Sequence, residues 1–465
     1  MALAQESSPS LFTPPYPATE EAIASPSDAV VSDLPWESAT QPAAPASYEA
    51  LAEDDASLAD RLKAVEAELK KLREAEAKKK EDAAKKPTMT LGGQLQADAI
   101  WFGQDQANMN AVGDLEDGWA FRRARIVSRG EAFDVVEYQC GFDFALSGRP
   151  SFLDVWVGLK DLPHLDSLRV GHFFEPFSLE RLTQNRYNTF LERSVADSFA
   201  PARNLGLMGS RAIFEEHVTL AAGVFRSDSD VLGDDTGDDG EQAATARATW
   251  LSHYDEASGG ASYVHWGLAY SYRDTDEGRV QFQARPEVSL NALGEGTVPS
   301  FVNTGFIPAD HYQLFGMEFA WIQGPFSVQS EVMLVPVDRL AGDDVTFEAA
   351  YIYGSYFLTG EHRPYIRKVG FMDRVMPFEN FFHVKTEEGT IETGKGAWEI
   401  AARLSYIDLD DDNIAGGELT DFTLALNWYL NPYTRVKWEY IHAHLDRNSV
   451  ESNAQIAGMR FDIDF

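Results

Sequence analysis

Apolar and polar residues alternate along the chain from Gly92 to its last residue. Strand side chains point to opposite faces in turn, so this period of two is typical of strands with one apolar face. The alternation is clearest in VVEYQCGFDFALSG (135–148), VHWGLAYSYRD (264–274), DFTLALNWYL (421–430) and the closing GMRFDIDF (458–465). Roughly 16 or 17 segments of about ten residues show it between turn residues, which predicts an all-β fold, a transmembrane antiparallel β-barrel of about 16 strands, over residues 87–465.

Aromatic residues separate this barrel from soluble all-β folds. A β-propeller would repeat a blade motif every 40 to 50 residues or so, and no such repeat is visible. A multi-sheet sandwich would not need large aromatics at strand ends on its apolar face. Seven tryptophans lie in the predicted strands, as expected for the aromatic girdle of a membrane barrel: Trp101, Trp250, Trp266, Trp321, Trp398, Trp428 and Trp438.

The pattern ahead of the barrel is different. Residues 1–54 are rich in Pro, Ala, Ser and Glu, a composition that predicts a flexible, disordered tail. Residues 55–86 follow as a predicted coiled-coil helix, whose apolar seam consists of Leu58, Leu62, Val65, Leu69 and Leu72 at alternating spacings of four and three. The seam predicts self-association, and an amphipathic helix docked elsewhere is the alternative.

Composition excludes several classes of protein. No run reaches the roughly 18 apolar residues of a membrane helix, so a helical membrane protein is excluded. The formal net charge of −35 argues against a nucleic-acid partner, because like charges repel. The single cysteine, Cys140, cannot form an internal disulfide. The first residues show no intact signal peptide, although ALAQ after Met1 has the form left at a signal-peptidase site.

One long connection carries the candidate chemistry. Between two predicted strands the alternation stops at EPFSLERLTQNRYNTFLERSVADSFAPARN, residues 175–204. This connection is far longer than an ordinary hairpin turn, and its apolar residues give it surface to pack. We expect it to fold into the barrel as a constriction loop that presents Arg181, Arg186, Arg193 and Arg203. The alternative is an extracellular lid whose arginines are solvated.

The chain resembles the phosphate-selective porin O and P family of bacterial outer membranes. The resemblance rests on FRRARI (121–126), SFLDVWVGLKDLP (151–163), RVGHFFEPFSLERLTQNRYNTFLERS (169–194), FAPARNLGLM (199–208) and the closing FDIDF. It implies a 16-stranded barrel, usually a homotrimer in outer-membrane lipid, with small anions led to an arginine-lined constriction. A coiled coil ahead of the barrel is a familiar addition in such porins, and its implied place is the periplasm.

The resemblance also implies site residues. It puts Arg123 and Arg125 on the inward face, leaves Arg122 near a rim, and adds Arg181 and Arg186 of the loop. Alternation along the predicted strands, without support from the resemblance, also places six further basic residues on the inward face: Arg273, Arg279, Arg285, Arg403, Arg435 and Lys437. The family's phosphate-binding constriction uses a lysine, whereas residues 175–204 contain none. Phosphate is therefore one candidate solute among small anions.

The remaining motifs suggest no enzyme and no bound cofactor. GTIETGKG (389–396) lacks the Ser or Thr of a phosphate loop and precedes a strand, and no nucleophile elbow or HExxH helix occurs. The acidic loop 228–241 offers Asp234, Asp235, Asp238 and Asp239 as weak calcium candidates, with a solvated loop as the other interpretation. Two functions remain: passive diffusion of anions through a porin, or a structural anchor that tethers the cell wall or surface layer through the coiled coil.

Overall fold

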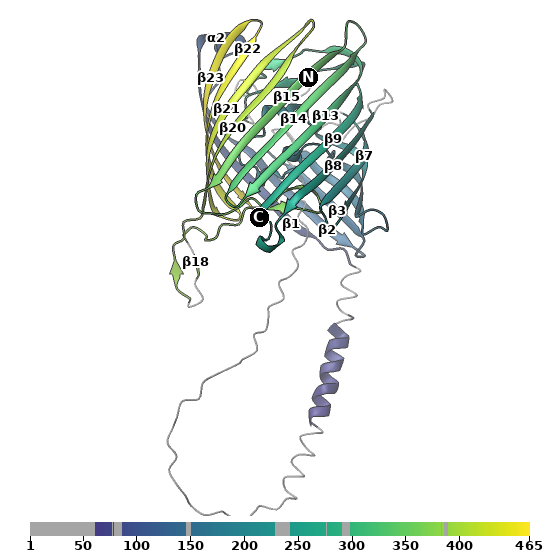
Figure 1. Cartoon of the computed structure of the whole chain (residues 1–465). Coiled ribbons are helices and arrows are strands. Elements are labelled where there is room, and N and C mark those ends of the chain that lie inside the picture. The colour runs from purple at the N-terminus through teal and green to yellow at the C-terminus, as the bar shows by residue number, and fades with distance from the viewer. Residues whose placement is uncertain are drawn as a thin grey trace, which may run out of the picture. The chain divides into compact units, whose positions relative to one another are not determined.

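The computed structural model describes residues 61–76, 78, 86–145, 150–227, 242–275, 277–290, 298–382, 384–385 and 389–465. Sixteen long strands form one closed antiparallel barrel (Figure 1), which confirms the predicted fold class and resolves the strand count to an even number. The barrel strands are β1 (Thr90–Gln104), β2 (Gly118–Ala132), β3 (Val136–Asp143), β4 (Ser151–Lys160), β5 (Ser167–Phe174), β6 (Arg203–Ile213), β7 (Val218–Arg226), β8 (Gln242–Tyr254), β9 (Ser262–Asp274), β13 (Ile307–Gln323), β14 (Phe326–Arg339), β15 (Val345–Phe357), β20 (Ala397–Asp411), β21 (Ile414–Asn431), β22 (Thr434–Arg447) and β23 (Val450–Asp464).

The barrel closes where its first strand pairs with its last. β1 and β23 run antiparallel, with Gln94 opposite Asp464 and Gln104 opposite Ala454. Phe465 extends this seam, since it exchanges backbone hydrogen bonds with Gly93 at 2.9 and 3.1 Å. Both ends of the barrel therefore lie at one rim, here called the terminal rim, and the opposite end is the far rim.

Short elements occupy the connections. At the far rim lie α2 (Gln106–Val112), β10 (Arg279–Val280), which pairs with β13, and the hairpin of β11 (Gln283–Ala284) and β12 (Val302–Asn303). The connection between β5 and β6 holds α3 (Leu179–Leu182), η1 (Asn185–Tyr187) and η2 (Val195–Phe199), and η3 (Glu256–Ser258) lies between β8 and β9. The connection between β15 and β20 carries the hairpins β16 (Tyr365–Ile366) with β17 (Phe371–Met372) and β18 (Val384–Lys385) with β19 (Ile391–Glu392).

The two faces of the wall differ as the alternation predicts. Outward side chains such as Leu268, Ile352 and Leu404 are at least half exposed, whereas inward polar ones such as Arg403 and Asp421 are buried. The outward face is thus an apolar band. The inward face is polar but is covered, so other parts of the chain must fill the barrel.

Three connections fold inward and provide that cover. The constriction segment (175–202) and residues 281–290 and 298–304 enter from the far rim, and the terminal-rim segment (361–375) enters from the opposite end. The first two meet in an apolar cluster in which Phe199 packs edge to face on Phe282, with ring centroids 5.6 Å apart. Phe282 in turn packs against Phe347 of the wall. The barrel interior is therefore partly an apolar core.

The segment ahead of the barrel contains a helix over residues 61–76. Its predicted seam residues Leu62, Val65, Leu69 and Leu72 are 47–63% exposed in the single chain, and Leu58 lies outside the described residues. None of the helices among the described residues has the length and apolar character needed to cross a membrane. The predicted tail, residues 1–54, also lies outside the described residues.

The closing seam generates a first prediction. A methyl group at Gly93 would lie 2.5 Å from the Arg125 carbonyl oxygen and 2.6 Å from Cζ of Phe465, both too close for any real contact. Gly93→Ala should therefore impair closure and lower the yield of folded barrel, measured as the fraction that migrates faster on gels before heating. Gly103→Ala in the same strand is the matched control, because its nearest neighbour lies at 3.7 Å. Equal yields for both variants would contradict the seam argument.

Candidate pore constriction

The constriction segment is held at its start by a carboxylate of the wall. Ser178 adopts a positive φ of 68°, and its side chain caps α3 by accepting from the Arg181 amide at 3.1 Å. Glu331 of β14 accepts from the backbone amides of Leu179 and Glu180 at 3.1 and 2.7 Å. A carboxylate satisfies the free amides of a helix start, so the wall fixes where the segment turns.

Glu192 of this segment is bound by three arginines of the wall. Its carboxylate accepts from Arg122 Nε at 3.0 Å, Arg123 Nη2 at 2.9 Å and Arg460 Nη2 at 2.6 Å. Burial alone would raise the pKa of Glu192, but the three guanidinium groups hold it well below the usual carboxyl range. Arg460 also binds Asp98 at 2.6 Å. The group combines three cations with two carboxylates and ties the segment to β1, β2 and β23.

A β-bulge explains why two successive arginines reach the same carboxylate. The register between β1 and β2 shifts between Gln96 and Ala97, which pair with Arg123 and Phe121 and leave Arg122 between them. A bulge adds one residue to a strand and re-aims its side chain. Arg122 consequently points inward and is 3% exposed, so its predicted place near a rim is wrong.

The six predicted site arginines all lie inside the barrel, and each one is paired. Their carboxylate partners are Glu192 for Arg123 (2.9 Å), Asp143 for Arg125 (2.6 Å), Asp197 for Arg181 (2.9 Å) and Arg193 (3.7 Å), Asp464 for Arg186 (2.7 Å) and Asp154 for Arg203 (2.8 Å). Arg193 also donates to the carbonyls of Glu180, Arg181 and Thr183. The pairs of Arg123 and Arg186 join the segment to the wall, those of Arg181 and Arg193 lie within the segment, and those of Arg125 and Arg203 join neighbouring parts of the wall.

The basic residues that were placed on the inward face by alternation alone divide into two groups. Arg273, Arg403, Arg435 and Lys437 are buried and point inward. Arg279 instead lies in the far-rim connection, paired with Glu277 and 46% exposed at its side chain, so its inward placement is wrong. Arg285 follows β11 in the far-rim connection and does not lie in a barrel strand.

Two of these residues support the constriction segment. Arg403 binds Glu180 at 3.1 Å, and burial still raises the pKa of Glu180 to about 7. Lys437 of β22 donates to the Asn188 and Phe190 carbonyls at 2.7 and 2.9 Å. A lysine therefore reaches the segment from the wall, although the segment itself has none.

The terminal-rim segment was not predicted to take part. Arg363 donates to the Tyr187 carbonyl at 3.0 Å, and Arg374 lies over the Tyr187 ring at 5.2 Å. Arg374 also joins Arg186 at the carboxylate of Asp464. The hairpin of β16 and β17 is also held by His265 of β9, whose Nδ1 is hydrogen-bonded to the Tyr365 hydroxyl at 2.7 Å. The unusual length of the 358–396 connection was the one sequence signal for this role.

Buried charges are distributed unevenly around the lumen. Strands β1, β2, β22 and β23 carry six buried cations and four buried carboxylates, whereas β13, β14, β15, β20 and β21 carry one cation and four carboxylates. The acidic side faces the apolar cluster of the two far-rim segments. The cationic side has the greater density of positive charge.

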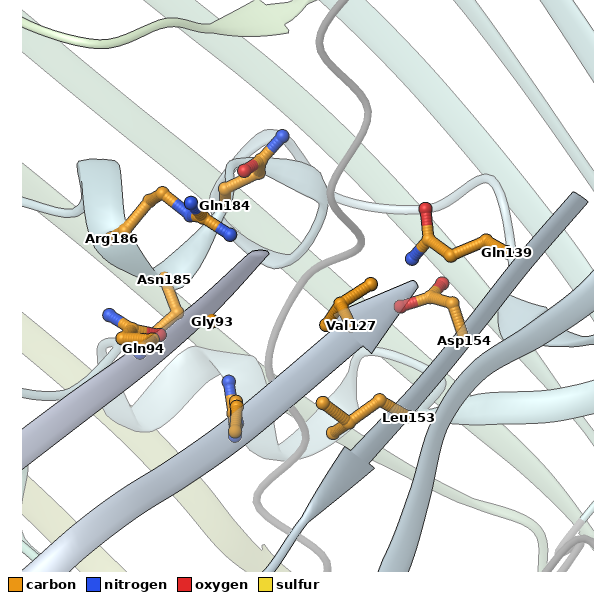
Figure 2. A pocket seen from close by; sticks show the side chains of 10 residues that line it. Gly93, Gln94, Val127, Gln139, Leu153, Asp154, Gln184, Asn185 and Arg186 are labelled. Carbon is orange, nitrogen blue, oxygen red and sulfur yellow. The ribbon is translucent and has the colours of Figure 1, made fainter. Parts of the chain in front are cut away.

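A narrow cavity lies inside the barrel (Figure 2). It offers about 10 Å³, enough for a water-sized group, and touches strands β1 to β4 and the constriction segment. Gln184, Asn185 and Arg186 lie to one side of it, and Gln139 and Asp154 lie across from them. Arg125 also lines it. Guanidinium and amide groups thus border this cavity. The calcium candidates Asp234, Asp235, Asp238 and Asp239 lie outside the described residues.

Comparisons with known proteins agree with this architecture. Residues 89–465 match the sequence model of a family described as phosphate-selective porin O and P. The chain is 27% identical to Porin O of Pseudomonas aeruginosa over 391 residues, which cover 77% of this chain and 83% of that protein. It is 26% identical to a protein of Caulobacter vibrioides over 369 residues, 75% of this chain and 68% of the other.

Solved structures that align with the chain include two bacterial proteins. OmpT of Vibrio cholerae has a TM-score of 0.48 at 13% identity, with 81% of this chain and 99% of that chain covered. An anion-selective porin from Comamonas acidovorans has a TM-score of 0.46 at 12% identity, with 81% and 100% covered.

The three-arginine group predicts a large effect of one neutral substitution. Glu192→Gln should leave Arg122, Arg123 and Arg460 facing one another without their shared carboxylate, and removal of one partner from a buried ion pair costs about 3–5 kcal/mol. The folded barrel should then lose its fast-migrating form at a temperature several degrees lower. Glu116→Gln, an exposed glutamate of the far rim, is the control. If the two variants unfold together with the wild type, Glu192 does not hold the segment.

Proposed function

We propose, for a chain that belongs to the phosphate-selective porin O and P family, that it forms an outer-membrane channel through which small anions diffuse passively. The closed barrel and its apolar outer band fit a membrane-spanning pore. The family and the fold point to a channel and not to an enzyme. The constriction segment is the part of the chain that narrows the passage.

The observation that carries anion preference is the position of the narrow cavity. It opens beside the guanidinium groups of Arg125 and Arg186. The four strands that it touches carry three buried cations and three buried carboxylates, so the proposed preference rests on these two guanidinium groups. An ion in a narrow lumen is poorly screened, so charges at contact distance outweigh the acidic residues that make up the net charge of −35. The pairing of each predicted site arginine with a carboxylate limits the size of this preference.

Phosphate is one solute that we propose for this channel. The relative at 27% identity carries the name Porin O, and the matching family is described as phosphate-selective. Bidentate guanidinium groups suit phosphate, yet Arg125 and Arg186 already bind Asp143 and Asp464. We therefore expect phosphate to compete only modestly with chloride.

The arrangement in the membrane follows from the even strand number. Both ends of the barrel lie at the terminal rim, and we propose that this rim, the helix 61–76 and the tail ahead of it face the periplasm. The exposed apolar seam of the helix supports a homotrimer held partly by a coiled coil. The same seam supports the second candidate function, a structural anchor that tethers the cell wall or surface layer.

Selectivity can be tested at the arginine whose removal disturbs the fold least. Arg186→Gln removes a cation from the edge of the cavity and should therefore reduce anion preference. The fold should persist, because Arg374 still binds Asp464 when Arg186 is gone. The reversal potential of single channels in a salt gradient should shift toward the cation side, by an amount that corresponds to an anion-to-cation permeability ratio lower by about twofold or more. Arg279→Gln, at the exposed far rim, should leave it unchanged. A wild-type channel that prefers potassium over chloride would refute the proposal.

Assembly can be tested at the seam of the helix. Replacement of Leu62, Val65 and Leu69 by Asp should weaken trimers in mild detergent, because charges at seam positions prevent packing, and the barrel should stay folded. Native gels measure the trimer, and single-channel conductance shows whether the pore still opens. The same triple change at the polar positions Glu66, Lys70 and Arg73 is the control. Unchanged trimers in the seam variant would show that other contacts hold the subunits.

A further inference from the structure

A groove of about 700 Å³ lies in the apolar outer band. It runs across β14, β15, β20, β21 and β22, and its lining includes Phe326, Tyr356, Ile400, Leu424 and Trp438. These strand positions lie in the half of the barrel that is nearer the terminal rim. The groove therefore lies at the depth of one leaflet and not at the middle of the band.

The floor of the groove is a cross-strand pair of small residues. Gly354 of β15 lies opposite Ala402 of β20, and both point outward. Large side chains surround this pair on neighbouring positions, namely Tyr356 and Ile400 along the strands and Leu424 on β21. Two small residues between larger side chains leave the space that forms the groove.

A second pair of small residues lies on the outward face away from this groove. Ala222 of β7 lies opposite Ala246 of β8, also on the outward face. The next outward residues along β8, Ala244 and Ala248, are small as well. Larger side chains flank this pair too, namely Leu220 and Val224 along β7 and Tyr270 opposite Ala246 on β9. The pair is more exposed than Gly354 and Ala402 and lies outside the groove, so it provides a control for leucines added to the outward face.

Aromatic side chains mark the end of the groove nearest the terminal rim. Trp398 stacks on Trp428 with ring centroids 5.0 Å apart and on Trp438 at 6.4 Å. Phe381, from the connection between β15 and β20, packs edge to face on Trp428 at 4.6 Å. Indoles prefer the boundary between hydrocarbon and lipid head groups, so the groove extends from this boundary into the hydrocarbon.

We propose that this groove binds one acyl chain of a glycerophospholipid of the leaflet at the terminal rim. The inference rests on the proposed placement in an outer membrane. The groove is continuous with the apolar band, is lined mostly by apolar side chains and has its mouth at the aromatic boundary, as an acyl chain with its head group outside requires. Methylene groups of an acyl chain in the groove would make more van der Waals contacts than the same groups on a flat wall.

The test fills the groove and measures bound lipid. Gly354→Leu with Ala402→Leu is made in the full chain, and a Cβ at Gly354 would meet nothing closer than 3.8 Å, so the change fits the backbone. Ala222→Leu with Ala246→Leu is the control. Each protein is stripped of lipid in detergent, mixed with phosphatidylethanolamine and examined by native mass spectrometry. The wild type and the control should retain one lipid per chain, and the filled variant should retain several-fold less.

The outcomes separate this proposal from its alternatives. Equal lipid retention in the filled and control variants overturns it. Unchanged lipid with a loss of oligomer in the filled variant also overturns it and assigns the groove to a second copy of the chain. If the double variant does not fold, Ala402→Leu alone provides the same comparison. Reversal potentials measured on the same proteins test the anion channel separately, since the groove lies outside the lumen.

Discussion

The pairing of β1 with β23 is the constraint on which the rest of the structure depends. In hydrocarbon an unpaired backbone amide or carbonyl has no water to satisfy it, so a sheet must close on itself. The register of this seam also sets the interior. It places Asp98 opposite Arg460 and Gln94 opposite Asp464, and these polar side chains then meet the constriction segment. Closure and the arrangement of charge inside the barrel thus follow from the same set of strand pairs.

The interior shows why a lumen lined with arginine need not be strongly cationic. A buried guanidinium is expensive to remove from water unless a carboxylate and carbonyl oxygens surround it. Among the described residues the chain meets this requirement with slightly more buried carboxylates than buried lysines and arginines, and much of the ionic network serves to hold three inward segments. Selectivity then depends on where the pairs lie. The apolar cluster covers the acidic side, and the narrow cavity lies beside Arg125 and Arg186.

Alternation along the sequence was enough to predict the barrel and its inward and outward faces, and the motifs at 121–126, 151–163 and 169–208 carried the resemblance to the family. The alternation also identified the stretch that forms the constriction segment, because a break of thirty residues in a regular period is visible without a structure. Partners were not predictable, since a pair such as Arg123 and Glu192 depends on how a loop folds back on a wall. Arg122 was misplaced because a bulge changes parity locally. The terminal-rim segment was missed because its inward hairpin has strands of only two residues.

Asp464 has a consequence for the order of assembly. Arg186 comes from a segment that enters at the far rim, Arg374 from one that enters at the terminal rim, and both bind the carboxylate of the penultimate residue. A polypeptide that grows strand by strand has this acceptor only after every other strand exists. The two segments therefore receive their last anchor when the sheet becomes a cylinder, so the packing of the interior and the completion of the wall form one cooperative step. The lumen takes its final shape only in a finished barrel, and an open sheet has no preformed pore.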